Sequence, residues 1–245
     1  NTNTTENTYF NNIIKSSNWK EPITVYGYND LSVLNKNYWE AETNCVNVLG
    51  QSATAKTSNL AFWDHFKNNN NLIQLTSNPL IYDNNKTYVA LIYGDMDNLD
   101  IVQNIGYLNM LERNSSCYNQ NCFPLTWTMS PLLLDLARPI IDWYYNIVKN
   151  TKQDWFIMPP SGYLYSYPTE MPKNIQNIYG NNMDIFAKKM NTSATIHWEW
   201  FYNQNNFTKY VGNTSSKLIK TYLFNNVPWL IPTTINKKII NNKLI

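Results

Sequence analysis

Two carboxylates follow a run of strand-forming residues near the middle of this sequence. Residues 88–93 (YVALIY) are β-branched, aromatic, small or aliphatic, and Asp95 and Asp97 come directly after them. Such a run predicts a strand buried on both faces, and α/β proteins place their ligand sites at the carboxyl ends of such strands. Asp95 and Asp97 are therefore the first candidate catalytic residues. The structural alternative is that Asp97 caps the following helix and Asp95 only makes a turn.

Other polar side chains follow predicted strands in the same way. Glu199 is a third candidate catalytic carboxylate, because it lies two residues after His197 and therefore on the same face of a strand. It could equally be a charge on a solvated face. The candidate substrate-binding residues at strand ends are Asp30, Asn98 and His197.

A tyrosine-rich loop is the most unusual local sequence. Residues 160–168 read PSGYLYSYP, with Gly162 ahead of Tyr165 and Tyr167. Alternating tyrosines followed by a proline predict a rigid loop that presents phenol groups to a cleft. The alternative is a packing loop whose tyrosines cover the mouth of the predicted barrel. Aromatic faces suit a sugar ring and phenol groups bond its hydroxyls, so Gly162, Tyr165 and Tyr167 are candidate substrate-binding residues.

These residue types favour hydrolysis of glycosidic bonds, which needs a pair of carboxyl groups. Seven glycines without a cluster exclude a phosphate-binding loop and a dinucleotide fingerprint. Two histidines and three scattered cysteines give no zinc spacing, and no G-x-S-x-G elbow occurs. Two carboxylates alone are weak evidence for a hard cation. We therefore expect no cofactor and no metal.

Helical patterns separate the predicted strands. This alternation predicts repeated βαβ units and an α/β fold, most simply one barrel-like domain of about seven strands that lacks an eighth. A doubly wound open sheet is the alternative. The expected strands are residues 23–28, 45–49, 88–93, 125–129, 155–158, 195–200 and 228–231, and the expected helices are 31–43, a helix capped by Ser58, 97–111, 131–149 with a break at Arg138-Pro139, 183–190 and 215–224.

The chain predicts one domain over residues 21–235, flanked by a polar N-terminal arm (1–20) and a polar C-terminal tail (236–245). The net charge of +2 comes from scattered lysines, which argues against nucleic acid as the main partner. No apolar run is long enough to span a membrane, and no signal peptide opens the sequence.

Secretion or a cell-surface location is favoured by the sequons and by two close cysteines. Cys117 and Cys122 flank a short polar loop and could form a disulfide in an oxidising compartment, or stay free thiols. An asparagine-rich chain yields a similar number of sequons by chance, but all of these fall in stretches that we expect to be loops or element edges. The candidate glycosylation sites are Asn3, Asn85, Asn114, Asn191, Asn206 and Asn213.

Several of these segments together resemble the GxGYxYP family of proposed glycoside hydrolases. The tyrosine loop resembles the family signature, and residues 88–98 resemble its strand ending in Ser-Asp-Gly-Asp-Asn. Trp127 to Pro131, residues 139–145 and residues 154–156 are similar to further motifs in the family's order. The resemblance covers roughly residues 20–232. It implies a secreted or envelope-associated α/β-barrel protein that acts on carbohydrate.

The chain departs from the family pattern at three positions. Leu164 replaces the second glycine of the signature, and Gly94 and Met96 replace the serine and glycine around the carboxylates. A leucine disfavours a positive φ or fills space that a ligand could use. Two functions stay open. One is a carbohydrate-active enzyme, and the other is a non-catalytic glycan-binding or structural extracellular glycoprotein on a degenerate hydrolase-like fold. Either could belong to an extracellular assembly.

Overall fold

The structure is a computed structural model of the 245-residue chain. It describes residues 12, 23–26, 48–52, 58–76, 81, 83–118, 122–199, 204–226 and 239–244. Asp30, Asn3 and the predicted N-terminal arm, except for residue 12, lie outside these residues. The helix that we expected at 31–43 and the strand that we expected at 228–231 also lie outside them.

Parallel strands that follow one another in the chain lie side by side in the fold. β3, β4 and β5 form one parallel sheet, β6 and β7 pair in parallel in the next, and a parallel bridge between Met158 and Thr195 connects the two sheets. The strand order does not reverse from β3 to β7, as it would in a doubly wound sheet. These strands are β3 (Ile92–Tyr93), β4 (Leu125–Thr128), β5 (Asp154–Ile157), β6 (Ala194–Glu199) and β7 (Thr221–Asn226).

The strands do not close into a barrel within the described part of the chain. β1 (Ile23–Tyr26) and β2 (Val48–Ser52) form a separate parallel pair. β9 (Lys243–Leu244) adds to β7 in parallel, and β8 (Ile239–Ile240) pairs with β9 in the antiparallel sense. The fold is therefore mixed α/β with parallel sheets, and the closed barrel stays a prediction. Residues 239–244, which we expected in a polar tail, belong to the sheet.

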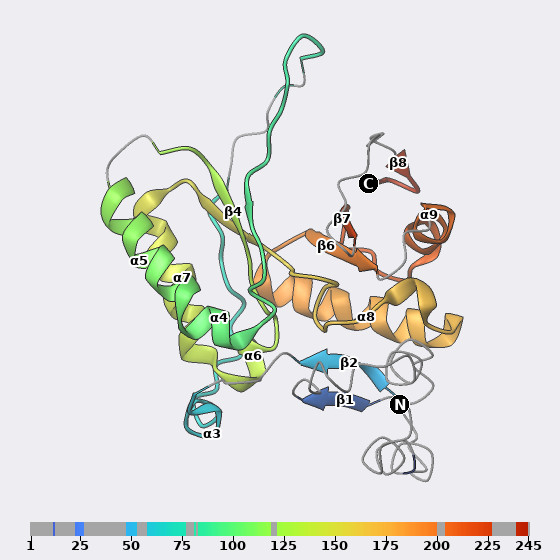
Figure 1. Ribbon diagram of the computed structural model, residues 1–245, viewed down its shortest axis with the longest axis horizontal. Coiled ribbons are helices and arrows are strands. Elements are labelled where there is room, and N and C mark those ends of the chain that lie inside the picture. Colours follow the sequence, from blue (N-terminus) through green and yellow to red (C-terminus); the bar gives the residue numbers. More distant parts are fainter. Residues whose placement is uncertain are drawn as a thin grey trace, which may run out of the picture.

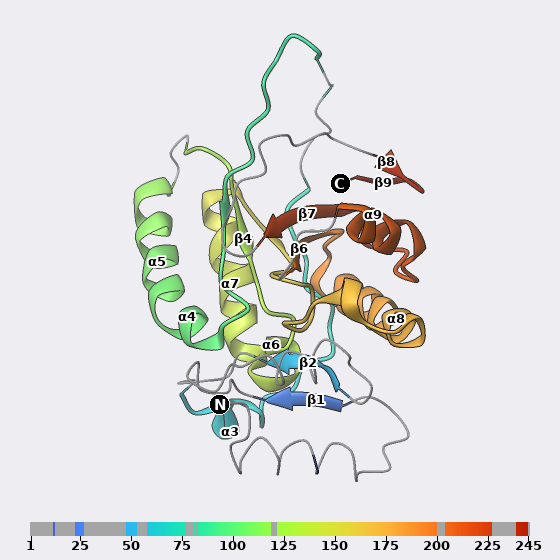
Figure 2. The ribbon, with the colours of Figure 1, turned by 45° about the vertical axis from the view of Figure 1, so that its right-hand side comes forward.

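Helices cover the strands on two sides. Figures 1 and 2 show α5 and α7 beside one another on one side of the strands, with α8 and α9 on the other. The helices are α3 (Leu60–Trp63), α4 (Leu99–Gln103), α5 (Ile105–Cys117), α6 (Leu133–Leu136), α7 (Arg138–Thr151), α8 (Lys173–Met190) and α9 (Gln204–Asn213), with a 3-10 turn at Pro168–Glu170.

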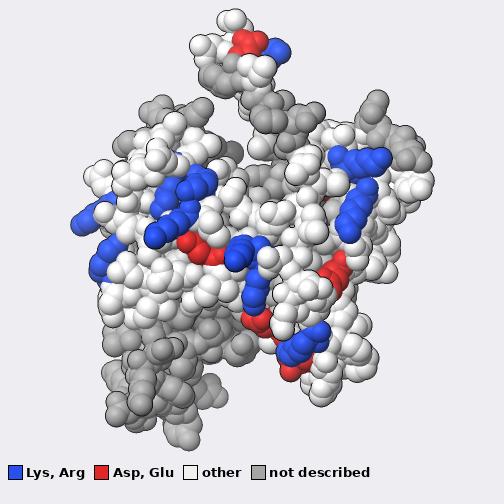
Figure 3. Space-filling model, turned by 180° about the vertical axis from the view of Figure 1, so that it is seen from behind, with Lys and Arg blue, Asp and Glu red and all other residues white. Residues whose placement is uncertain are grey.

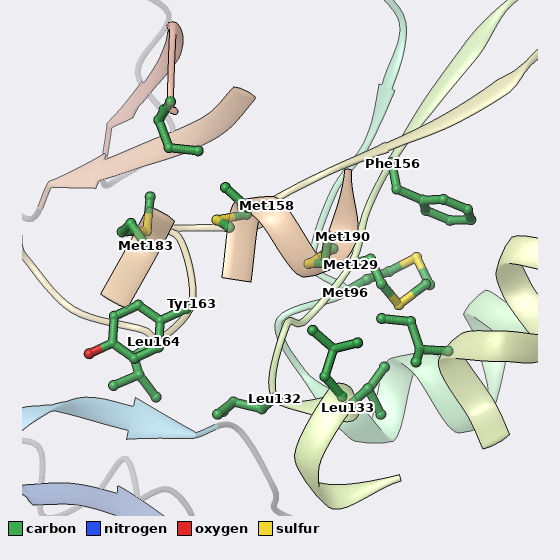
Figure 4. Close-up of a cluster of buried hydrophobic side chains, with 14 of the residues drawn as sticks. Met96, Met129, Leu132, Leu133, Phe156, Met158, Tyr163, Leu164, Met183 and Met190 are labelled. Atoms are coloured by element: carbon green, nitrogen blue, oxygen red, sulfur yellow. The ribbon is translucent and has the colours of Figure 1, made fainter. Parts of the chain in front are cut away.

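The core lies between these helices and the strands. In α7, Ile141, Tyr144, Tyr145 and Val148 recur at helical spacing, and all four are buried. The same cluster includes methionines from the ends of β3, β4 and β5 and from α8 (Figure 4). Met96 and Met129 are fully buried within it.

The strand that we expected at 88–93 is wrong for most of its length. Only Ile92 and Tyr93 pair with β4, whereas Tyr88, Val89 and Leu91 are 46%, 76% and 45% exposed. Figure 1 shows this segment reaching away from the helices and strands. Residues 88–91 have strand propensity, but the ladder with β4 begins only at Ile92, although the Leu91 carbonyl accepts from the Thr126 N–H at 3.0 Å. The side chains of residues 88–91 are exposed.

The C-terminal assignment is also wrong. The helix predicted at 215–224 overlaps the strand β7, and the preceding helix is α9, which we did not predict. Residues 221–224 (TYLF) are a short apolar run, and periodicity alone does not separate such a run from a helix segment.

Smaller corrections concern helix ends. Ser58 does not cap α3: Asn59 precedes the helix, and the Ser58 N–H donates to Gln103. The helix predicted at 97–111 is two helices, α4 and α5, which meet at Asn104. The predicted break near Arg138-Pro139 is present, since α6 ends at Leu136 and α7 begins at Arg138.

The structure joins Cys117 and Cys122 by a disulfide bond. Asn85, Asn191, Asn206 and Asn213 are exposed, and Asn114 is half-buried. Asn114 and Asn206 lie inside α5 and α9, so the expectation that every sequon falls in a loop or at an element edge is wrong for them.

Candidate active site at the carboxyl ends of the strands

Hydrogen bonds to β4 fasten the loop that carries both aspartates. The Thr128 hydroxyl donates to the Tyr93 carbonyl at 3.0 Å and accepts from the Met96 N–H at 3.2 Å. The Ser130 N–H donates to the Met96 carbonyl at 2.9 Å. Because the Met96 side chain is also buried in the core, the backbone of this loop is held on both sides of Asp95.

Asp95 and Asp97 flank that buried methionine and differ in their exposure to solvent. Asp95 is exposed and has a φ of 63°, a left-handed conformation that aspartate adopts more readily than most residues. Its carbonyl accepts from the Asn98 N–H, which closes the turn. Asp97 is half-buried. Met96 and Leu164 lie in the core and do not wall off this pair.

The two carboxylates are coupled electrostatically. Desolvation in its half-buried position, followed by the negative charge of Asp95, raises the pKa of Asp97 from 3.8 to about 7. Hydrogen bonds from the backbone N–H groups of Asp97 and Asn98 oppose this rise without cancelling it. A carboxyl group with such a pKa can donate and accept a proton near neutral pH.

Asn98 caps the helix that follows the aspartates. Its side chain accepts from the Asp100 N–H at 3.0 Å, which satisfies a free donor in the first turn of α4. The structural alternative for Asp97, a helix cap, is therefore wrong. Asn98 was expected to bind substrate, and in this structure its oxygen performs the capping role.

The tyrosine loop follows β5 and is fixed by packing. Gly162 has a φ of 118°, and a Cβ at this position would lie 2.1 Å from the Met183 sulfur. The Tyr179 hydroxyl donates to the carbonyls of Ser161, at 3.2 Å, and Leu164, at 2.7 Å. Leu164 is buried, so it packs in the core cluster beside Tyr163 (Figure 4).

Tyr165 and Tyr167 lie together at the end of this loop. Their hydroxyl oxygens are 3.1 Å apart, and their rings meet edge to face with centroids separated by 5.9 Å. Tyr167 is fully buried, whereas Tyr165 is half-buried. Of the two phenols, Tyr165 is therefore the one whose surface a ligand could reach in this conformation.

Strand register brings the two loops to one edge of the sheet. Tyr93 pairs with Trp127, Thr128 with Ile157, and Met158 with Thr195, all in parallel. The carboxyl ends of β3 to β6 therefore lie at the same edge, where the aspartate pair and the tyrosine pair both begin.

The other candidate residues do not join these two pairs in the described structure. His197 is 1% exposed and lies among Phe207, Tyr210 and Phe224, with the nearest ring centroid 4.5 Å away. Burial among aromatic rings makes its predicted contact with substrate incompatible with this conformation. Glu199 ends β6, but its side chain lies outside the described part of the structure.

Sequence reasoning missed two residues that position these loops. Thr128 belongs to the Trp127–Pro131 motif at a predicted strand end, so its position in the sequence could have identified it as a residue near the site. Tyr179 lies within α8, and no sequence feature indicated its role, because only the fold brings its hydroxyl to the tyrosine loop.

Three further observations concern the surface charge, metal-binding side chains and hydropathy of the described residues. On the face shown in Figure 3, basic and acidic side chains form small separate groups on a mostly uncharged surface. The described residues contain no cluster of three side chains suited to hold a metal ion. None of the described helices combines the length and apolar character needed to cross a membrane.

Comparison with known proteins gives a family and a fold. The model of the family described as "GxGYxYP putative glycoside hydrolase C-terminal domain" matches residues 85–231, more than half of the chain. A crystal structure of a protein described as a putative hydrolase from Bacteroides thetaiotaomicron has the same fold, with a TM-score of 0.75 and 20% sequence identity. The aligned region covers 96% of this chain and 43% of that protein. No curated protein matches the chain.

Proposed function

This chain belongs to the GxGYxYP family, and we propose that it is a carbohydrate-active hydrolase with its sugar site at the carboxyl ends of β3 to β5. The observation that carries the proposal is the coupled pair of Asp95 and Asp97. Glycoside hydrolysis needs two carboxyl groups in different protonation states, and a raised pKa is what the proton donor requires.

Each residue of the pair has a role in this proposal. Asp97 holds a proton near neutral pH because its pKa is about 7, and it donates that proton to the leaving oxygen. Asp95, which is exposed, is the second carboxylate and stabilises the developing positive charge or activates water. The fixed loop backbone at Met96 limits the motion of both side chains.

The tyrosine loop supplies substrate contacts in the proposal. Tyr165 presents a half-buried ring and a hydroxyl, and Tyr167 supports that hydroxyl through the 3.1 Å contact. Gly162 and Tyr179 keep the loop in position. Glu199 stays a candidate for a further carboxylate on the same rim, since it ends β6 at the same edge.

We also propose an extracellular or cell-surface location. A disulfide between Cys117 and Cys122 suits an oxidising compartment. Four sequon asparagines are exposed, which leaves them accessible to a glycosylating enzyme in a host that has one. Reducing and non-reducing gel electrophoresis of protein from its native compartment tests the disulfide.

A hydrolysis and glycan-binding screen tests the proposed activity. The wild-type protein, Asp95→Asn, Asp97→Asn and the control Asp135→Asn are incubated with a panel of soluble oligosaccharides. We expect turnover by wild type and by the control, and a loss of about a hundredfold or more in Asp97→Asn, which is the usual contribution of a general acid. Glycan binding that survives Asp95→Asn, with no turnover by any protein, would instead establish the non-catalytic binding function.

A further inference from the structure

A separate cavity lies among the helices, between α3, α4, the start of α5 and α7. Its volume is about 470 Å³, within the range of about 300–1,000 Å³ that small-molecule sites occupy. Helix residues form most of its wall, whereas Asp95 and Asp97 lie on a strand-end loop and do not line it. The cavity is therefore distinct from the candidate active site.

Aromatic rings from three different helices line this cavity. Trp63 comes from α3, Tyr107 from α5 and Trp143 from α7. The Tyr107 and Trp143 rings are 4.9 Å apart at an angle of 40°, so they form a corner instead of one flat stack. Tyr107 is 39% exposed, and the two tryptophans are half-buried. Ring faces in such a corner offer an apolar contact surface to a ligand.

The polar part of the lining is neutral. Ser58, Asn59 and Asn104 contribute hydroxyl and amide groups, and every described residue that lines the cavity is uncharged. Burying an ionic ligand there would leave its charge without a partner from the cavity wall. The lining therefore favours a neutral ligand that combines an apolar face with hydroxyl groups.

Hydrogen bonds hold the α3 wall in place at both ends. The Gln103 amide donates to the Ser58 carbonyl at 2.8 Å and accepts from the Ser58 N–H at 2.6 Å. Beyond α3, the Lys67 ammonium donates to the Asp135 carbonyl at 2.7 Å. These bonds fix the position of the α3 wall, and a fixed wall lowers the entropic cost of binding.

We propose that this cavity is a second carbohydrate-binding site, which takes a neutral sugar unit of a glycan against Trp63, Tyr107 and Trp143. The aromatic corner contacts the C–H face of the ring, and the amide and hydroxyl groups bond its hydroxyls. The choice of a sugar over other neutral ligands rests on the proposed function. Such a site would hold a polymeric substrate on the protein without taking part in the reaction.

Affinity electrophoresis tests the second site. Native gels are cast with starch, xylan, mixed-linkage β-glucan or mannan, and the migration of wild type is compared with Tyr107→Ala, Trp63→Ala and Asp97→Asn. Two controls match the aromatic variants: Leu108→Ala on α5 and Phe62→Ala on α3, which are 61% and 56% exposed and do not line the cavity. Urea unfolding of each variant verifies that it is folded.

We expect at least one polysaccharide to retard wild type, Asp97→Asn and both controls. Tyr107→Ala and Trp63→Ala should bind that polysaccharide about tenfold more weakly, which corresponds to about 1.4 kcal/mol. Equal retardation of folded Tyr107→Ala and wild type would overturn the second site, as would the absence of retardation in every gel. Retardation lost only in Asp97→Asn would assign the sugar to the strand-end site and also overturn this inference.

The hydrolysis screen with soluble oligosaccharides is an independent measurement, so it tests the proposed activity separately from the second site.

Discussion

At the scale of single residues, the chemistry of Asp97 depends on how far the fold removes its carboxyl group from water. Met96 is buried in the core and its N–H donates to Thr128 of β4, which holds the loop against the sheet beside Asp97. Desolvation then raises its pKa to about 7, with a further contribution from Asp95. A residue that the family pattern fills with glycine is here a core side chain.

The raised pKa predicts how stability depends on pH. Between about pH 4 and pH 7 the folded protein binds more protons at Asp97 than the unfolded chain, so stability falls as pH rises through this window. Asp97→Asn should flatten that part of the profile, and above pH 7 it should be more stable than wild type, because it lacks the carboxylate charge that desolvation penalises. Urea unfolding at several pH values measures both effects. The exposed control Asp135→Asn should keep the wild-type slope, and an unchanged slope in Asp97→Asn would contradict the assignment.

Gly162 is the position where the tyrosine loop tolerates least change. Gly162→Ala places a Cβ 2.1 Å from the Met183 sulfur and forces an alanine to a φ of 118°. We expect a loss of about 2 to 4 kcal/mol in the free energy of unfolding, from strain and overpacking together. Gly94→Ala is the matched control, because nothing lies within 4 Å of a Cβ there. Equal unfolding midpoints for the two variants would refute this account of the loop.

At the scale of elements, a buried ion pair joins α5 to β5. The Arg113 guanidinium donates to Asp154 at 2.6 Å, and the Trp127 indole N–H donates to the same carboxylate oxygen at 2.8 Å. The Thr151 hydroxyl at the end of α7 donates to the other oxygen. One carboxylate, at the amino end of β5, thus connects two helices and two strands.

Breaking this pair should destabilise the whole domain. Asp154→Ala leaves the Arg113 charge buried without its partner, so we expect a loss of about 3 to 5 kcal/mol in the free energy of unfolding. The exposed pair of Lys67 and Asp64 provides the comparison: Asp64→Ala should cost less than about 1 kcal/mol. Denaturant unfolding measures both. A loss below 1 kcal/mol in Asp154→Ala would show that the pair contributes no net stability.

Strand prediction succeeded for apolar runs that alternate with helical patterns along the sequence and that pair with a neighbouring strand in the fold. Strands near 125–129, 155–158 and 195–200 are present at nearly the predicted places. Residues 88–91 have the same composition but extend beyond the sheet, and residues 221–226 form a strand where a helix was expected. In both cases the presence or absence of a neighbouring strand determines the structure. That neighbour is set by the tertiary fold and cannot be inferred from local composition.

At the scale of the whole molecule, we expect the exposed segment at 87–91 to be less protected from hydrogen exchange than β4. Its apolar side chains face solvent and its residues precede the pairing of β3 with β4, which begins at Ile92. Hydrogen exchange with mass spectrometry should find fast exchange in peptides from 87–91 and slow exchange in peptides from 125–129. Protection of 87–91 equal to that of β4 would mean that a partner covers the segment in solution.

The candidate site could be predicted from sequence only in part. Asp95, Asp97 and the tyrosine loop follow strands, and the rule about carboxyl ends located them. His197 was placed near a strand end by the same reasoning, but it lies inside β6 and is buried among Phe207, Tyr210 and Phe224. The sequence does not reveal which face of β6 is covered. The raised pKa of Asp97 could not be predicted either, since it depends on how much water the fold removes.

The coupled aspartate pair is the centre of this account, and a carboxyl titration tests it without knowledge of the substrate. Carbon-13 NMR of the aspartate side chains, in wild type and in Asp95→Asn, follows Asp97 from pH 3 to pH 9. We predict that Asp97 titrates near pH 7 in wild type and at a lower pH in Asp95→Asn, because the neighbouring charge is removed. An Asp97 that titrates near 4 in both proteins would contradict the account.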